Sequence, residues 1–180
     1  KRFSISSNNE TTIIYLFGDR SNFDTTATYV ISKNLSNNKP SSKNVFYIKS
    51  PCKKIAALSS IYASVFFELG ALENLVAIDN IDYVCNAEII SRNKNNRLKE
   101  LARTQQLDLE QTVALNPDIL FTFGMGEGEK DKDKKLFQTG IPVVISIDHL
   151  EESPLARAEW LKFFAVLEKK RQLADSIFSE

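Results

Sequence analysis

The side chains that most often carry out catalysis are sparse in this chain. Its 180 residues include one histidine, His149, and two cysteines, Cys52 and Cys85. A Ser-His-Asp arrangement could be built only around His149, and the nucleophile motif Gly-x-Ser-x-Gly does not occur. We therefore expect no catalytic residues and no cofactor, and we predict a binding protein and not an enzyme.

Metal and phosphate chemistry is not indicated either. One histidine excludes a multi-histidine metal site, and Cys52 and Cys85 lack the Cys-x-x-Cys spacing of zinc sites. The glycine run 124–128 does not fit the dinucleotide pattern, because Glu129 stands at the third glycine position. We expect this loop to expose backbone N–H groups. The alternative is an α/β enzyme fragment that uses the 124–128 loop to hold a small molecule.

The composition is that of an ordinary globular protein, with 43% apolar and 26% charged residues. The 23 basic and 23 acidic side chains cancel, so nucleic acid is not an expected partner. No apolar stretch approaches the ~20 residues that span a bilayer. Because the chain opens on Lys1 and not on Met, we expect that it begins partway into a longer product.

The elements that must position any binding residues fall into three groups. Residues 1–50 contain short β-branched and aromatic runs at 12–17, 28–32 and 45–48, with polar segments at 18–22 and 34–44, which predicts a β-hairpin or meander. The last group, from Pro154 onward, contains no glycine and carries an apolar stripe at 3–4 spacing. Ser153 is a suitable cap, and a continuous helix of this length would extend about 40 Å.

The middle group alternates buried strands with helices, which predicts right-handed βαβ units and a parallel sheet. The fold class is therefore a three-layer α/β/α sandwich with a mostly parallel sheet. Cys52 precedes the first strand and Cys85 follows the second, some 15–20 Å away, so no disulfide is expected. The expected strands are 55–58, 75–78, 119–123 and 142–147, and the expected helices are 61–69, ended by Gly70, and 108–115, opened by Asp108.

Ligands of open parallel sheets bind beyond the carboxyl ends of the strands. Four loops meet this condition, and polar or aromatic residues occupy each. The alternative is structural: Ser60 only caps a helix, Tyr62 packs, and His149 is a solvated loop residue. The candidate ligand-binding residues are Ser59, Ser60, Ile61, Tyr62, Asp79, Asn80, Tyr83, Phe123, Gly124, Met125 and His149.

Four segments, taken together, resemble a known family. They are LSSIY at 58–62, LGALENLVAID at 69–79, LDLEQTVALNPDI at 107–119 and GIPVV at 140–144. In this order and spacing they are similar to the class III, helical-backbone substrate-binding proteins, which deliver ferric siderophores, haem or cobalamin to ABC importers. The segment 153–160 resembles the start of the rigid helix that joins the two lobes of these proteins. The β segment ending at 50–55 resembles a subgroup of bacterial surface lipoproteins.

The resemblance implies an organisation, a location and two partners. Residues 1–50 would be a β extension, 51–152 the amino-terminal lobe and 153–180 the start of the interlobe helix, with the second lobe absent. The partners would be a metal-chelate small molecule and an ABC permease in the membrane, and the location periplasmic or a cell-surface lipoprotein. A lobe that kept the fold but lost binding, as in a sensor or adhesin, is a further alternative.

Particular residues acquire roles from the same resemblance. Tyr83 and Phe123 stand in loops where the family carries aromatic residues, the second often stacking on ligand. His149 would ligate iron or cobalt only if the ligand left a coordination position open. Glu110 matches a surface glutamate that pairs with permease arginines. The alternative for Glu110 is an ordinary first-turn acid that is favoured by the helix dipole.

Overall fold

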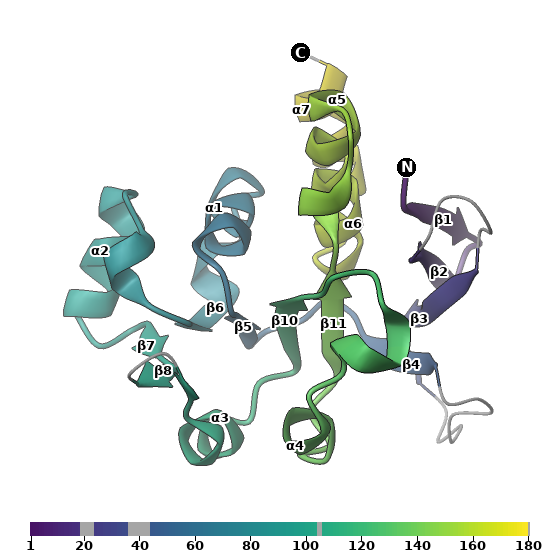
Figure 1. The fold of residues 1–180 in the computed structure, drawn as a ribbon. Coiled ribbons are helices and arrows are strands. Elements are labelled where there is room, and N and C mark those ends of the chain that lie inside the picture. Colours follow the sequence, from purple (N-terminus) through teal and green to yellow (C-terminus); the bar gives the residue numbers. More distant parts are fainter. Residues whose placement is uncertain (19–23, 36–43, 104–105, 180) are drawn as a thin grey trace. The chain divides into compact units, whose positions relative to one another are not determined.

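A computed structural model describes residues 1–18, 24–35, 44–103 and 106–179 (Figure 1). Most of the polar segments predicted at 18–22 and 34–44 lies outside these ranges. The chain divides into two compact units. Unit 1 comprises residues 1–51, 124–133 and 145–180, and unit 2 comprises residues 52–123 and 134–144. Neither unit is contiguous in sequence, and each is described by itself below.

The sheet of unit 1 has the strand order β1-β2-β3-β4. Strands β1, β2 and β3 form an antiparallel meander, and β4 pairs parallel to β3. The meander confirms the prediction for the amino-terminal segment, although β1 was not foreseen. The strands are β1 (Phe3–Ser7), β2 (Thr11–Phe17), β3 (Thr25–Ser32) and β4 (Val45–Lys49).

An aromatic cluster forms the core of unit 1. The Phe163 ring lies 4.9 Å from Trp160, 5.7 Å from Phe3 and 6.0 Å from Tyr29, measured between centroids. All four side chains are at most 2% exposed. The Tyr29 hydroxyl accepts a hydrogen bond from the Ile145 backbone N–H at 3.0 Å, and burial raises the pKa of this phenol. Residues from the first strand and from the helices after 153 are thus locked together.

The carboxyl-terminal segment is a helical hairpin and not one continuous helix, so that part of the prediction is wrong. The segment contains α5 (Pro154–Ala158), α6 (Trp160–Leu167) and α7 (Arg171–Ser179). Ser153 caps α5 as expected, by accepting the Ala156 N–H. Lys162 of α6 contacts both Asp175, at 3.3 Å, and the Phe178 ring of α7, which shows that the two helices lie side by side (Figure 1).

The reversal of direction occurs at Lys169, which adopts a left-handed conformation with φ of 55°. The Lys169 N–H donates to the Val166 carbonyl and the Lys170 N–H to the Ala165 carbonyl, which is the hydrogen-bond pattern of a Schellman motif. The same pattern ends α1 at Gly70, whose φ is 57°. The end of α1 could be predicted because glycine is typical of this position, whereas the lysine at the equivalent position of α6 gave no such signal.

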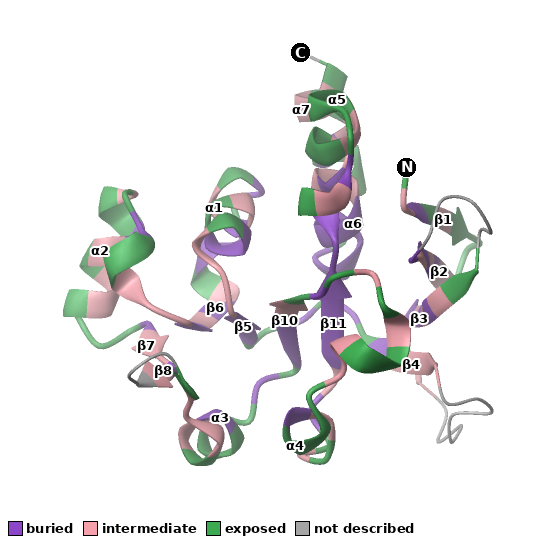
Figure 2. Ribbon diagram, viewed as in Figure 1, coloured by how far each residue is buried: buried purple, intermediate pink, exposed green. Residues whose placement is uncertain are grey.

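Unit 2 is built on the parallel strands of a five-stranded sheet with order β11-β10-β5-β6-β7, in agreement with the predicted fold class. Figure 2 shows these central strands largely buried and the helices with exposed outer faces. The core contains Ala56, Ala77, Leu120 and Val143, one from each of four strands. The strands are β5 (Ile55–Ala57), β6 (Leu75–Ile78), β7 (Lys99–Glu100), β10 (Ile119–Phe123) and β11 (Val143–Ser146), whose last two residues belong to unit 1.

The connections of unit 2 are short helices and one small hairpin. The hairpin β8 (Ala102–Arg103) and β9 (Gln106–Leu107) was not foreseen in the polar stretch that precedes Asp108. Asp108 caps α3 by accepting the Gln111 N–H at 2.9 Å, as predicted. The helices are α1 (Ser60–Glu68), α2 (Ala87–Lys94), α3 (Leu109–Leu115) and α4 (Lys134–Phe137).

The two cysteines of unit 2 are not joined by a disulfide, as predicted. Cys52 is buried and Cys85 is exposed. We expect a thiol reagent to label one cysteine in the native protein and two in the unfolded, unreduced protein, because reaction requires contact with the thiolate. Replacement of Cys85 by serine should abolish the native labelling. A count of zero in the unfolded protein would contradict the topology.

Candidate ligand-binding site

The carboxyl ends of three neighbouring strands form one edge of unit 2. Ala57 of β5 is in register with Phe121 of β10 and with Ile78 of β6. Because adjacent strands lie about 4.8 Å apart, the loops that follow them emerge next to one another. We call residues 58–62, 79–83 and 123 the carboxyl edge. It contains eight of the eleven predicted ligand-binding residues.

The first loop of the carboxyl edge leads from β5 into α1. Ser59 is the cap, accepting the Ile61 N–H at 3.3 Å, and Ser60 is the first helical residue. The Ile61 side chain is 58% exposed, whereas Tyr62 is 2% exposed and its ring lies 6.4 Å from Phe121. Tyr62 is therefore a packing residue of the core, and we do not include it in the proposed ligand surface.

The second loop follows β6 and forms the 3-10 turn η2 (Ile81–Tyr83). Asn80 caps this turn by accepting the Asp82 N–H at 2.8 Å. Tyr83 is 66% exposed, and Asp82 is exposed as well. Asp82 was not among the predicted residues, although its position two residues after an asparagine cap could have indicated it.

Asp79 is half-buried between β6 and this turn. Its Oδ1 atom is covered and has no hydrogen-bond partner among the described residues. Burial raises the pKa of the carboxyl, and backbone N–H groups of Asn80 and Asp79 offset part of that rise. A carboxylate in this state is stabilised by any ligand group that brings a positive charge or a hydrogen-bond donor.

Replacement of Asp79 by asparagine should stabilise unit 2 at pH 7. When folding raises the pKa of a carboxyl group, the group destabilises the folded protein increasingly as the pH rises from the ordinary pKa to above the raised pKa. The expected gain is up to about 1 kcal/mol, limited by the partial exposure of the side chain. It should vanish below about pH 4, where aspartate is protonated in both states. Urea unfolding, followed by circular dichroism, measures this gain in the free energy of unfolding. Asp82→Asn is the control, because Asp82 is exposed. An equal gain in the control would contradict the argument from the burial of Asp79.

Three predicted residues belong to unit 1 and are described apart from the carboxyl edge. Met125 is 59% exposed in the loop that Gly124 opens. The expectation that this loop offers backbone donors is wrong for Met125 and Glu127, whose N–H groups donate to the Asp131 carboxylate at 2.7 and 2.9 Å. His149 is exposed in the turn η4 (Asp148–Leu150). No group of three or more potential metal ligands occurs among the described residues.

The carboxyl edge has a distinct chemical character. Ile61, Tyr83 and Phe123 are each at least 58% exposed, one on each of the three loops. The edge contains two carboxylates, Asp79 and Asp82, and its sequence includes no lysine or arginine. The surface can therefore pack against apolar or planar groups and favours ligands that are neutral or positively charged.

Glu110 is exposed in the first turn of α3, as predicted. In the same helix the Val113 side chain is 50% exposed, and Thr112 is wholly buried. The Leu101 N–H donates to the Ile78 carbonyl and the Asp108 N–H to the Leu101 carbonyl. These two bonds place the start of α3 beside the carboxyl end of β6, so Glu110 lies near the carboxyl edge and not at the opposite end of the strands.

Open parallel α/β sheets commonly bind ligands beyond the carboxyl ends of their strands, and the exposed apolar and acidic residues of unit 2 lie there. The sequence model of the periplasmic binding protein family matches residues 55–153, more than half of the chain. The chain therefore belongs to this family. No curated protein sequence matches it significantly. Within the described residues, no helix is long and apolar enough to cross a membrane.

Solved structures of transport proteins share the fold. PiuA, the substrate-binding protein of an iron-uptake ABC transporter of Streptococcus pneumoniae, is 16% identical with a TM-score of 0.54, over 73% of this chain and 44% of PiuA. A periplasmic haem-binding protein of Pseudomonas aeruginosa is 19% identical with a TM-score of 0.52, and the match covers 71% of this chain and 42% of that protein. FhuD2 of Staphylococcus aureus, solved with ferrioxamine B, is 20% identical with a TM-score of 0.50, and the match covers 69% of this chain and 42% of FhuD2. The chain thus spans less than half the length of each.

Proposed function

We propose that this chain is part of the substrate-binding component of an ABC importer that takes up metal chelates of the ferric siderophore, haem or cobalamin kind. The observation that carries the proposal is the family match over residues 55–153, which includes all three loops of the carboxyl edge. The exposed apolar residues of that edge support it, because ligand sites are lined mainly by apolar and aromatic groups. The chelate would lie between this lobe and a second one.

The charge of the carboxyl edge narrows the class of ligand. Asp79 and Asp82, without a neighbouring lysine or arginine on the edge, oppose the carboxylates of haem and the negative charge of catecholate chelates. A neutral corrinoid or a cationic hydroxamate chelate is compatible with this surface. Tyr83 and Phe123 would pack against the apolar parts of such a ligand.

Titration of the 180-residue chain with ferrioxamine B, cobalamin and haem tests the proposal. Binding should be no tighter than roughly micromolar, about −8 kcal/mol, because one lobe buries only one side of a ligand. Ferrioxamine B or cobalamin should bind better than haem, and Tyr83→Ala should weaken the interaction. Nanomolar affinity would refute the interpretation that this lobe provides only one side of the ligand site. The absence of binding by all three chelates would leave the fold as the only property shared with the transport proteins.

The family also suggests where the protein works. We propose a periplasmic or cell-surface location, with a lipid anchor as in the surface lipoproteins that the amino-terminal segment resembles. The permease of the importer would be the membrane partner.

Docking to that permease provides a prediction for Glu110. In the whole protein reconstituted with its permease, Glu110→Ala should reduce transport at least several-fold while ligand affinity is unchanged, because an exposed carboxylate can pair bidentately with arginine. Glu88→Ala is the matched control. Like Glu110, Glu88 is an exposed acid in the first turn of a capped helix, in this case α2, whose cap is an asparagine. Intact transport, or loss of ligand binding, would remove Glu110 from this role.

A further inference from the structure

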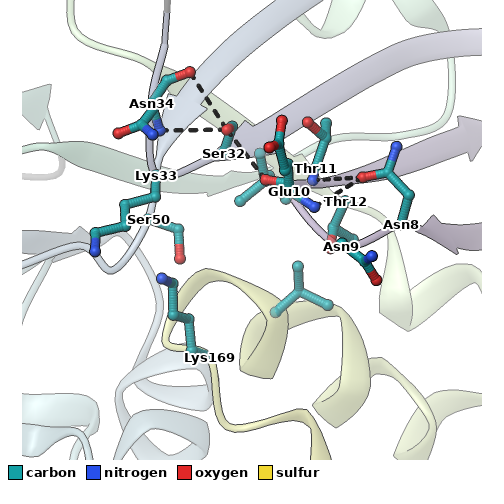
Figure 3. Close-up of a pocket in the computed structure, with 12 residues that line it drawn as sticks. Asn8, Asn9, Glu10, Thr11, Thr12, Ser32, Lys33, Asn34, Ser50 and Lys169 are labelled. Atoms are coloured by element: carbon teal, nitrogen blue, oxygen red, sulfur yellow. Dashed lines mark hydrogen bonds between the residues drawn. The ribbon is translucent and has the colours of Figure 1, made fainter.

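A second candidate binding site lies in unit 1. A cavity of about 450 Å³ opens between the β1–β2 turn, the end of β3 and the turn that joins α6 to α7 (Figure 3). This volume is within the range of small-molecule sites, which is about 300–1,000 Å³. Its lining is mainly polar and includes Asn8, Glu10, Ser32, Lys33, Ser50 and Lys169.

Internal hydrogen bonds hold the walls of the cavity in place. The Ser50 hydroxyl, 2% exposed, donates to the Leu167 carbonyl at 2.8 Å and so fixes the end of β4 to the end of α6. The Ser32 hydroxyl donates to the Glu10 carbonyl at 3.1 Å. Asn8 accepts the N–H groups of Glu10 and Thr11 at 3.0 and 2.7 Å, which closes the β1–β2 turn. These bonds fix the β1–β2 turn, its contact with the end of β3, and the contact between β4 and α6 without a ligand.

Two lysines bring positive charge to this cavity. Neither Lys33 nor Lys169 forms an ion pair with a described residue. Figure 3 shows both ammonium groups near the Ser50 side chain. Glu10 is the one acid among the described residues that line the cavity, and its carboxylate is directed away from them in the same view. Both side chains are exposed, and two ammonium groups without an acidic partner among the described residues can together hold an anion at one end of a polar cavity.

Lys169 occupies a conformation that lysine adopts at a cost. A side chain in the left-handed region costs about 1 kcal/mol relative to glycine, the residue found at the equivalent position of α1. Local strain of this kind is common at residues that contact ligands. Here the strained residue is also one that directs its charged group toward the cavity.

We propose that this cavity binds a small organic anion with at least two carboxylate or phosphate groups, held between Lys33 and Lys169. The residues of this site belong to unit 1, whereas those of the carboxyl edge belong to unit 2, and the proposal does not depend on the proposed transport function. The cavity volume of about 450 Å³ suits an organic molecule better than a single inorganic ion.

Isothermal titration calorimetry of the 180-residue chain tests the proposal, with citrate, fructose 1,6-bisphosphate and glucose as probes. Citrate or the bisphosphate should bind, and the better of the two identifies the preferred anionic group. Glucose should not bind, and added salt should weaken the anion through screening. Lys169→Gly should lower affinity at least about tenfold, the effect of one charge-assisted hydrogen bond, while thermal stability is equal or higher because the strain is removed. Lys33→Met should lower affinity similarly.

The control is Lys94→Gln, which removes one positive charge from an exposed position of α2. Affinity for the anion should be unchanged in this variant. The proposal is overturned if neither anion binds at millimolar concentration, if glucose binds equally well, or if Lys169→Gly keeps the wild-type affinity. An equal loss of affinity in Lys94→Gln would also overturn it, because the effect would then be one of net charge.

Discussion

Phe163→Ala should destabilise unit 1 by about 3–5 kcal/mol, the usual cost of emptying a buried phenylalanine site. The Phe163 ring is 0% exposed and contacts Phe3, Tyr29 and Trp160. Its loss removes apolar burial and leaves a cavity between a strand and a helix, which the surrounding rings cannot fill without leaving their own positions. Since domains are commonly stable by 5–15 kcal/mol, this single change could leave unit 1 largely unfolded at 37 °C.

Trp160 is the one tryptophan of the chain and is 2% exposed, so its fluorescence follows urea unfolding of unit 1 directly. Leu155→Ala is the matched control within unit 1, because Leu155 is 66% exposed and its truncation should change stability by no more than about 0.5 kcal/mol. Similar midpoints for Phe163→Ala and the wild type would show that the aromatic cluster does not stabilise the unit.

Glu151→Ala should cost unit 1 about 3 kcal/mol, through polar groups and not through packing. The Glu151 side chain is 4% exposed, and its Oε1 atom accepts the Arg2 backbone N–H at 2.6 Å and the Trp160 indole N–H at 3.2 Å. Truncation removes the acceptor of the buried indole N–H and of the part-buried Arg2 N–H. Each buried donor without a partner costs about 1–3 kcal/mol.

The adjacent Glu152 is exposed, so Glu152→Ala should stay within about 0.5 kcal/mol of the wild type. Glu151→Gln separates charge from hydrogen bonding, because its side-chain carbonyl can still accept one or both N–H groups. We expect an intermediate loss for this variant in the same unfolding experiment. Equal stability of the Glu151→Ala and Glu152→Ala variants would contradict the role given to the buried carboxylate.

Local signals in the sequence predicted much of the fold. The caps at Asp108 and Ser153 and the glycine at 70 act through hydrogen bonds and backbone angles within a few residues, so their effect can be read from the sequence. The parallel strands were visible as apolar runs. Strands β1 and β7 were not, because their partners lie elsewhere in the chain and their own residues are few or polar.

The candidate site was predictable in its position and less so in its details. The loops at the carboxyl ends of β5, β6 and β10 follow from the topology, and the structure describes all three. The sequence could not distinguish the exposed Ile61 from the buried Tyr62, because the rotation of α1 against the sheet decides which neighbour faces inward. It also could not show that Asp131 takes the backbone donors of the glycine loop, since that contact depends on the folded turn.

The interleaved division of the chain has a consequence for folding during synthesis. All residues of unit 2 have been made once residue 144 has left the ribosome, whereas unit 1 needs residues up to the last helix. At about 5–20 residues per second, the strands of residues 1–51 wait several seconds for Trp160 and Phe163 to appear. Unit 2 can therefore fold first on the emerging chain, while the apolar face of the amino-terminal meander stays uncovered until the carboxyl-terminal helices have been made.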